Sequence, residues 1–170
     1  AFIFDEVVTG FRVHPGGAQA HFNIRADLAT YGKVVGGGIP IGILAGKSEY
    51  MDALDGGFWQ FGDNSIPEVG VTFFAGTFVR HPMALAAAEA VLKKLKEGGV
   101  ELQHSLSAKV DKFVTHMKQH LERVQAPIKI AHFSSFFYVT YAPEATYGGL
   151  LFYLLREKGV HIWEHRPCFF

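Results

Sequence analysis

The chain of 170 residues has the size of one domain, or of parts of two. With 49% hydrophobic and 19% charged residues it has the composition of a globular protein with a core. Sixteen basic residues balance sixteen acidic ones, which gives no charge pattern for nucleic acid or an anionic membrane to recognise. No apolar run approaches the roughly 20 residues that span a bilayer. The single cysteine, Cys168, excludes an internal disulfide and fits a reducing compartment, so we expect a cytoplasmic protein.

The first residues predict a buried strand that ends in charge. Ala1-Phe2-Ile3-Phe4 is continuously apolar and Asp5-Glu6 follows at once, a pattern typical of a parallel strand buried on both faces. Ligands of open α/β sheets lie beyond the carboxyl ends of such strands, which places Asp5 where a carboxylate can do chemistry. Because the sequence starts in such a strand and without Met, we expect a piece of a longer protein.

Three further segments are expected in the first half. Residues 9–25 are rich in Gly and Pro and predict an irregular loop. Residues 28–31 predict a second strand, and residues 41–45 predict a third. Residues 55–76, rich in glycine and aromatic side chains, predict a long ordered loop of the kind that is usually functional.

The second half predicts alternating helix and strand. A helix should begin at Pro82 and end at the glycine pair 98–99, and a second amphipathic helix should run to Pro127. The remainder predicts a β-rich segment over 128–141, a helix over 147–158 and a short strand over 160–163. The change of character after the paired glycines predicts two subdomains, residues 1–97 and 98–170.

The informative constellation is Asp5, Lys33 and the glycine run 36–38 that follows this lysine. Glycines let the backbone bend sharply and let a bulky group approach closely. A partly desolvated lysine forms Schiff bases. A carboxylate beside a pyridine nitrogen favours the protonated ring, the electron sink of pyridoxal phosphate (PLP). Taken alone, the pattern also fits a solvated lysine at a turn and an aspartate that caps a loop.

Other kinds of site match the sequence less well. A P-loop carries Gly-Lys-Ser/Thr after its first glycine, whereas Lys33 precedes the glycines, and these lack the spacing of a dinucleotide fingerprint. His116 and His120 lie four residues apart on a predicted helix, but no third ligand is evident, so we predict no metal site. Cys168 is interpreted as a small buried hydrophobe and not as a nucleophile.

Three motifs resemble one family. The segment Phe4-Asp5-Glu6-Val7-Val8-Thr9-Gly10-Phe11-Arg12 resembles the Asp-Glu-Val-x-Thr-Gly-Phe-Arg motif of class III aminotransferases, most of all in their glutamate-1-semialdehyde aminomutase branch. Residues 32–42 resemble that family's Schiff-base motif, and the separation of 28 residues (33 − 5) between Asp5 and Lys33 fits the family. Ala75-Gly76-Thr77 resembles the stretch whose threonine contacts the cofactor phosphate of the neighbouring subunit. The resemblance covers essentially the whole chain.

The resemblance implies PLP as cofactor and the α/β fold of PLP-dependent transferases of fold type I, the aspartate-aminotransferase type. Residues 1–97 would then belong to the large cofactor domain, and residues 98–170 to part of the C-terminal small domain. It also implies a homodimer, and a substrate entrance near the end of the chain, which holds His161, His165 and Arg166.

The same resemblance implies a role for each site residue. Asp5 would pair with the pyridine nitrogen and Val7 would pack against the ring. Lys33 would hold the aldimine and then shuttle a proton between substrate and cofactor carbons. Thr77 would bind the phosphate across the dimer interface. The alternatives are a strand-end core residue at Val7 and a turn hydroxyl at Thr77.

One segment departs from the aminomutase pattern, since residues 56–70 are longer than that branch normally has. With residues 78–82 and 161–169 they resemble aminotransferase domains of cyanobacterial hybrid polyketide/nonribosomal peptide synthetases of the microcystin and nodularin type. Such domains aminate a β-keto acyl chain held on an acyl carrier protein, with an amino acid as the amine donor. The alternatives are a free-standing aminomutase and an inactive scaffold, because the family's phosphate cup and stacking aromatic residue lie upstream of Ala1. We expect the 170-residue piece alone to be poorly active.

Overall fold

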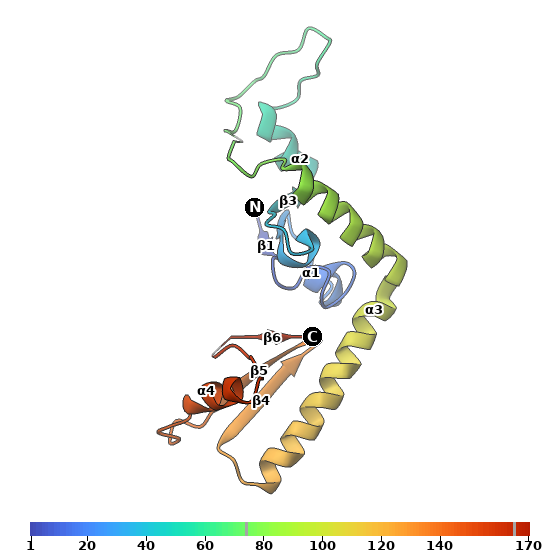
Figure 1. Cartoon of the computed structure of the whole chain (residues 1–170). Coiled ribbons are helices and arrows are strands. Elements are labelled where there is room, and N and C mark those ends of the chain that lie inside the picture. Colours follow the sequence, from blue (N-terminus) through green and yellow to red (C-terminus); the bar gives the residue numbers. More distant parts are fainter. Residues whose placement is uncertain (74, 165) are drawn as a thin grey trace. The chain divides into compact units, whose positions relative to one another are not determined.

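The computed structural model describes residues 1–73, 75–164 and 166–170 (Figure 1). The chain forms two compact units, Ala1–Gly99 and Val100–Phe170. No helix within the described ranges is long and apolar enough to cross a membrane. His165, which was expected near a substrate entrance, lies outside the described residues.

The first unit is built on a sheet of three strands in the order β1-β2-β3. These are β1 (Ile3–Asp5), β2 (Leu28–Tyr31) and β3 (Ile43–Gly46), close to the three predicted strands. Strands β1 and β2 are parallel, and β3 runs antiparallel to β2. The parallel pair places the carboxyl ends of β1 and β2 at the same edge of the sheet.

The expectation of a first strand buried on both faces is wrong for this chain. Phe2 is 49% exposed and Ile3 is 60% exposed. In the part of the chain that the structure describes, β1 is the edge strand of the sheet and pairs with β2, and no described segment covers the side chains of Phe2 and Ile3 completely.

Several short helices of this unit were not predicted. They are α1 (Gly17–His21), η1 (Lys33–Gly36), α2 (Ser48–Met51) and η2 (Asp52–Asp55). Each is five residues or shorter, so none carries the repeating apolar pattern by which a helix is recognised in a sequence. Helix α1 lies inside the segment 9–25 that was expected to be irregular.

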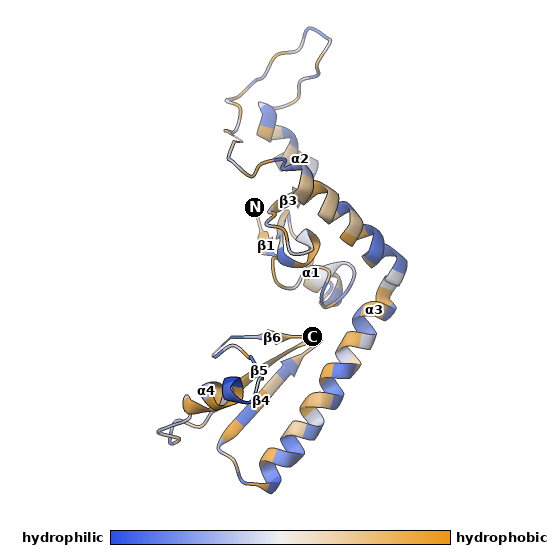
Figure 2. Cartoon of the chain, viewed as in Figure 1, coloured by the Kyte–Doolittle hydropathy of each residue, from blue (hydrophilic) through white to orange (hydrophobic). Residues whose placement is uncertain are grey.

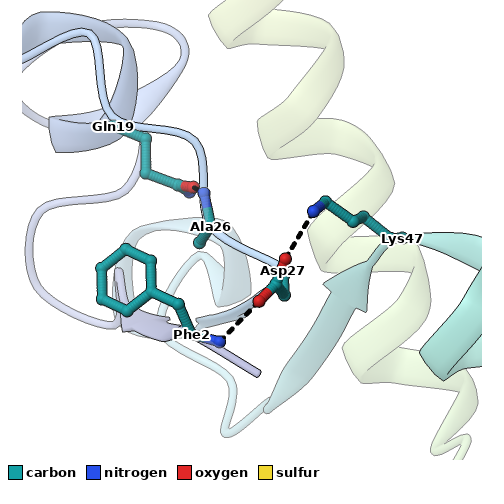
Figure 3. A network of polar contacts seen from close by, with 5 residues as sticks. All are labelled: Phe2, Gln19, Ala26, Asp27 and Lys47. Carbon is teal, nitrogen blue, oxygen red and sulfur yellow. Dashed lines mark hydrogen bonds and ion pairs between the residues drawn. The ribbon is translucent and has the colours of Figure 1, made fainter.

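A polar network links the three strands at the end of the sheet opposite to the carboxyl ends of β1 and β2 (Figure 3). The carboxylate of Asp27 accepts a hydrogen bond from the Phe2 N–H at 2.6 Å and forms an ion pair of 2.5 Å with Lys47 Nζ. The hydrogen bond with Lys47 lowers the pKa of Asp27 and raises that of Lys47. Since these residues adjoin the starts of β1 and β2 and the end of β3, one carboxylate links all three strands.

Helix α3 (Pro82–Arg123) begins where the sequence predicts and bends at Gly99, whose φ of 54° and ψ of −154° are not helical. Helical residues continue directly on both sides of the bend, so the two predicted helices follow each other without a loop. In the second unit the helix contributes one apolar side, and Figure 2 shows hydrophobic and hydrophilic residues alternating along it.

The second unit has a sheet in the order β4-β5-β6, all antiparallel, with helix α4 (Leu150–Glu157). Its strands are β4 (Ile128–Phe133), β5 (Phe136–Tyr141) and β6 (Cys168–Phe169). The core of the unit joins α3 to β4 and β5, and its buried residues are Val110, Val114, Leu121, Ile130, Phe137 and Val139.

The strand predicted over residues 160–163 is wrong. After α4 the Val160 N–H bonds back to the Leu155 carbonyl at 2.8 Å, and Gly159 has a φ of 78°, an arrangement typical of a helix C-terminus. The position beside β5 is instead taken by β6, where Cys168 pairs with Phe137.

Candidate active site

Asp5 and Lys33 emerge at the same edge of the first sheet. Asp5 is the last residue of β1, and its register partner on the parallel strand β2 is Thr30. Lys33 follows three residues after Thr30, at the start of η1. Both Asp5 and Lys33 are exposed in this chain. The two residues expected to act on one ligand therefore leave neighbouring strands at their carboxyl ends, where ligands of such sheets bind.

The carboxylate of Asp5 is oriented by two donors that reach the same oxygen. Oδ1 accepts hydrogen bonds from the Val7 N–H at 2.8 Å and from the Thr30 hydroxyl at 3.2 Å. Among the residues that the structure describes, no donor reaches Oδ2. Oδ1 of Asp5 is thus hydrogen-bonded within the protein, and Oδ2 is available to a ligand.

Val7 lies beside the glycine that precedes Lys33. A β-carbon added to Gly32 would be 3.5 Å from Val7 Cγ1 and 3.1 Å from the Ile41 carbonyl oxygen. A larger residue at position 32 would be in ordinary contact with Val7 and would crowd only the Ile41 carbonyl oxygen, which favours the glycine. The Val7 side chain, which is half-buried, therefore packs against the backbone that leads into Lys33.

The backbone at Lys33 is strained. Its φ of 40° lies in the left-handed region, which a residue with a side chain rarely adopts and which is concentrated at functional sites. The turn that follows is held against helix α3, because a β-carbon at Gly37 would lie 2.8 Å from Val91 Cγ2. Glycine at position 37 permits this close approach and so helps to hold the lysine turn in place.

Glu6 anchors the segment between Asp5 and Val7, and the sequence analysis missed it. It is 1% exposed, and its carboxylate accepts hydrogen bonds from the Ala18 N–H at 3.0 Å, the Gln19 N–H at 2.9 Å and the Thr9 hydroxyl. The first two donors belong to the start of α1, where a negative charge is favourable. Strand alternation, which sends adjacent side chains to opposite faces, was the signal that Asp5 and Glu6 differ in role.

Two groups in this part of the first unit have shifted pKa values. Burial, with a further contribution from the Glu6 carboxylate, raises the pKa of Tyr31, which stands two residues before Lys33. Burial also lowers the pKa of Arg12, whose Nε donates to the Val8 carbonyl at 3.3 Å. The segment that follows Asp5 thus has partly buried polar contacts at Glu6 and at Arg12.

Thr77 is not brought together with Asp5, Val7 and Lys33 in this chain. It is exposed and lines a groove of about 1070 Å³ between β3, residues 76–81 and the first half of α3. Neither Asp5, Val7 nor Lys33 lines this groove. The role of Thr77 across a dimer interface stays a prediction.

His116, His120 and Cys168 were the other candidate site residues considered from the sequence. His116 and His120 are exposed, and Nδ1 of His120 lies 2.9 Å from a guanidinium nitrogen of Arg123. Within the described ranges, no group of three His, Cys, Asp or Glu residues could hold a metal ion. Cys168 is half-buried and packs against the core of the second unit.

Solved structures share the fold of this chain. A transaminase with PLP bound matches with a TM-score of 0.79 at 23% identity, over 99% of this chain and 38% of that one. An omega-transaminase from Sphaerobacter thermophilus matches with a TM-score of 0.77 at 22% identity, over 98% and 38%. These matches confirm that the chain has part of the α/β fold of PLP-dependent transaminases.

Sequence comparison identifies the family. The sequence profile of aminotransferase class III matches residues 1–167. A glutamate-1-semialdehyde 2,1-aminomutase of Methanococcus maripaludis is 35% identical over 172 residues, covering 94% of this chain and 37% of that protein. The chain therefore spans about 37% of the length of this relative. It belongs to the class III aminotransferase family.

Proposed function

We propose that the protein carrying this chain is a PLP-dependent enzyme that transfers amino groups, with Lys33 as the residue that holds the cofactor. The observation that supports this is the position of Asp5 and Lys33, which leave adjacent parallel strands at the same edge with the Asp5 carboxylate already oriented. Residues 1–97 would supply part of the cofactor domain and residues 98–170 part of the small domain.

The residues present fit the ring of PLP. Oδ1 of Asp5 is occupied by two donors of the chain, so Oδ2 remains to accept a hydrogen bond from a pyridine N–H. Val7, half-buried beside Gly32, offers an apolar side chain next to the lysine. Lys33 is exposed, so its amine is accessible to an aldehyde.

When bound, PLP supplies a protonated ring that accepts negative charge from the substrate carbon. Asp5 would favour the protonated ring nitrogen, because a neighbouring carboxylate stabilises a cation. Val7 would hold the plane of the ring and exclude water from one of its faces. Lys33 would carry the cofactor through a covalent bond to Nζ, and its released Nζ would move a proton at the substrate carbon.

The curated relatives favour a small amino aldehyde as substrate, as in glutamate-1-semialdehyde 2,1-aminomutases. A protein of this kind would move an amino group within one small molecule and would need no carrier protein. Incubation of the full-length protein with glutamate-1-semialdehyde and PLP would then yield 5-aminolevulinate, detected by mass spectrometry.

A second substrate is favoured by one feature of the first unit. Phe58, Phe61 and Phe73 in the loop 56–73 are 73%, 98% and 90% exposed, so three large apolar side chains of this loop are open to an apolar ligand. This loop would contact a β-keto acyl chain tethered to a carrier protein, as in microcystin-type synthetases, with an amino acid as donor. Phe61→Ser should then slow amination of a carrier-bound β-keto acyl thioester and leave turnover of the small aldehyde unchanged.

Thr77 would act on the cofactor of a second copy of the chain in a homodimer. Mixing Lys33→Arg copies with Thr77→Val copies tests this directly. If Thr77 acts across the interface, each mixed dimer has one doubly altered site and one intact site, and activity returns. If Thr77 acts within its own subunit, no site in the mixed dimer is intact and activity stays low.

The deciding experiment is borohydride reduction of the full-length protein with PLP, followed by peptide mass spectrometry. A pyridoxyl group on Lys33 is expected, and it should be absent from Lys33→Arg and present in the control Lys47→Arg. Lys47 is a suitable control because its Nζ is engaged in an ion pair with Asp27. An unmodified Lys33 in folded wild-type protein would refute the proposal and favour an inactive scaffold.

A further inference from the structure

We propose that Thr30 is a positioning residue that orients the Asp5 carboxylate toward the ring nitrogen of the cofactor. This inference rests on the proposed function. The observation behind it is the hydrogen bond of 3.2 Å from Thr30 Oγ1 to Asp5 Oδ1, the same oxygen that accepts the Val7 N–H.

Strand pairing places the two residues side by side. Asp5 and Thr30 are register partners in the parallel pair of β1 and β2. The Thr30 carbonyl also accepts a hydrogen bond of 2.8 Å from the Glu6 N–H. Thr30 thus contacts β1 through its backbone and through its side chain, and its hydroxyl lies at a defined place relative to Asp5.

The hydroxyl restricts a side chain that is otherwise free to turn. Asp5 is exposed, and the terminal torsion of an aspartate is broad. With both donors on Oδ1, that oxygen is held by two hydrogen bonds, and rotation of the carboxylate would weaken at least one of them. Without the hydroxyl, the Val7 N–H alone would hold Oδ1, and rotation about that single contact would move Oδ2.

The position also explains the residue type. A β-branched side chain suits a strand, and the threonine hydroxyl can serve a neighbouring strand because its backbone bonds are already made. The adjacent strand residues Leu28, Ala29 and Tyr31 have no hydroxyl at the β-carbon. Thr30→Val therefore removes the donor while keeping the shape, and Thr30→Ser keeps the donor while removing a methyl group.

The test uses the full-length protein in four forms: wild type, Thr30→Val, Thr30→Ser and the control Thr140→Val. Thr140 is a suitable control because it also lies in a strand, β5, and among the described residues its hydroxyl donates to the Lys129 carbonyl at 3.5 Å. Three quantities are measured: the dissociation constant for PLP, the pH dependence of the visible absorption of bound PLP, and the unfolding midpoint of the cofactor-free protein.

Thr30→Val should weaken PLP binding about tenfold, the loss expected for one hydrogen bond to a charged group. It should also shift the pH profile of the visible absorption. Thr30→Ser and Thr140→Val should resemble wild type, and the unfolding midpoints of the four cofactor-free proteins should agree. In an Asp5→Asn background Thr30→Val should cause no comparable further loss of affinity, because the hydroxyl acts through Asp5.

Two results would overturn the inference while leaving the proposed function intact. One is wild-type affinity and pH profile in Thr30→Val. The other is an equal loss of affinity from Thr30→Val with and without Asp5→Asn, which would indicate a role independent of Asp5. If instead wild-type protein gives no borohydride adduct at Lys33, the proposed function fails, and the inference falls with it.

Discussion

A β-carbon at Gly17 would lie 2.5 Å from Oε1 of Glu6, so helix α1 begins in direct contact with the buried carboxylate next to Asp5. Gly17 also has a φ of 71°, in the left-handed region. Gly17→Ala should therefore lower the free energy of unfolding by about 2 kcal/mol through strain and a close contact. Gly42→Ala is the control in a denaturant titration, since a β-carbon at Gly42 meets nothing within 4 Å. Equal stability of the two variants would contradict the prediction.

At position 33 the proposed covalent bond to the cofactor requires a lysine, whereas the backbone conformation favours a glycine. Because φ is 40°, Lys33→Gly should be more stable than Lys33→Ala by about 1 kcal/mol. Neither variant should give a borohydride adduct at residue 33. Chemical denaturation of the two variants measures the difference, and a more stable Lys33→Ala would show that the backbone at this position is not strained.

The ion pair of Asp27 and Lys47 predicts a window of pH in which the first unit is most stable. The pKa of Asp27 is lowered on folding, so its contribution is complete above its unfolded value of about 3.9 and is lost as pH falls through the lower folded value. The pKa of Lys47 is raised, so its contribution is complete below about 10.4 and is lost as pH rises through the higher folded value.

Asp27→Asn should accordingly unfold at a lower temperature than wild type at pH 7, and the difference should shrink as the pH falls below about 4. High salt should reduce only the part that comes from the exposed ion pair. Thermal unfolding followed by circular dichroism measures both trends. A difference that is constant from pH 3 to pH 7 would show that the charge of Asp27 is immaterial.

Gly99 has backbone angles that only glycine adopts readily, and a β-carbon there would meet nothing within 4 Å. Gly99→Ala should therefore destabilise the protein by about 1–3 kcal/mol through backbone strain alone. Gly70→Ala is the matched control, because its surroundings are equally open and its φ is not in the left-handed region. A neutral Gly99→Ala variant in a denaturant titration would indicate that the helix straightens at no cost.

The sequence predicted the elements that carry a repeating pattern. The strands of the first sheet and the start of α3 at Pro82 follow from apolar runs and from residues with special backbone preferences. The glycine pair was expected to end a helix, whereas α3 continues through it with a bend at Gly99. The sequence also singled out Asp5 and Lys33 as a pair, because each lies at or just beyond the carboxyl end of a predicted strand. That the two strands are parallel neighbours is confirmed by their pairing.

What the sequence did not reveal depends on contacts between distant residues. Helix α1 is short and is stabilised by the Glu6 carboxylate, 11 residues (17 − 6) before its first residue, so no local pattern announces it. The hydrogen bond between Thr30 and Asp5 spans 25 residues and exists only because of the strand register. The short strand β6 replaced the predicted strand over 160–163 because pairing with β5, and not local hydrophobicity, decided which segment joined the sheet.

The contacts of Asp27 with Phe2 bear on which acid the protein presents to its ligand. The Phe2 N–H binds the Asp27 carboxylate, and the Phe2 carbonyl accepts the Asp27 N–H at 2.9 Å. A slip of one residue between β1 and β2 would reverse the two faces of β1. In the slip that brings Glu6 opposite Thr30, Glu6 would stand where Asp5 now meets Thr30, and Asp5 would take the place of Phe4 opposite Ala29, on the other face of the strand. The hydrogen bonds between Phe2 and Asp27 at one end of the strand thus help to select one of two adjacent acids at the other end.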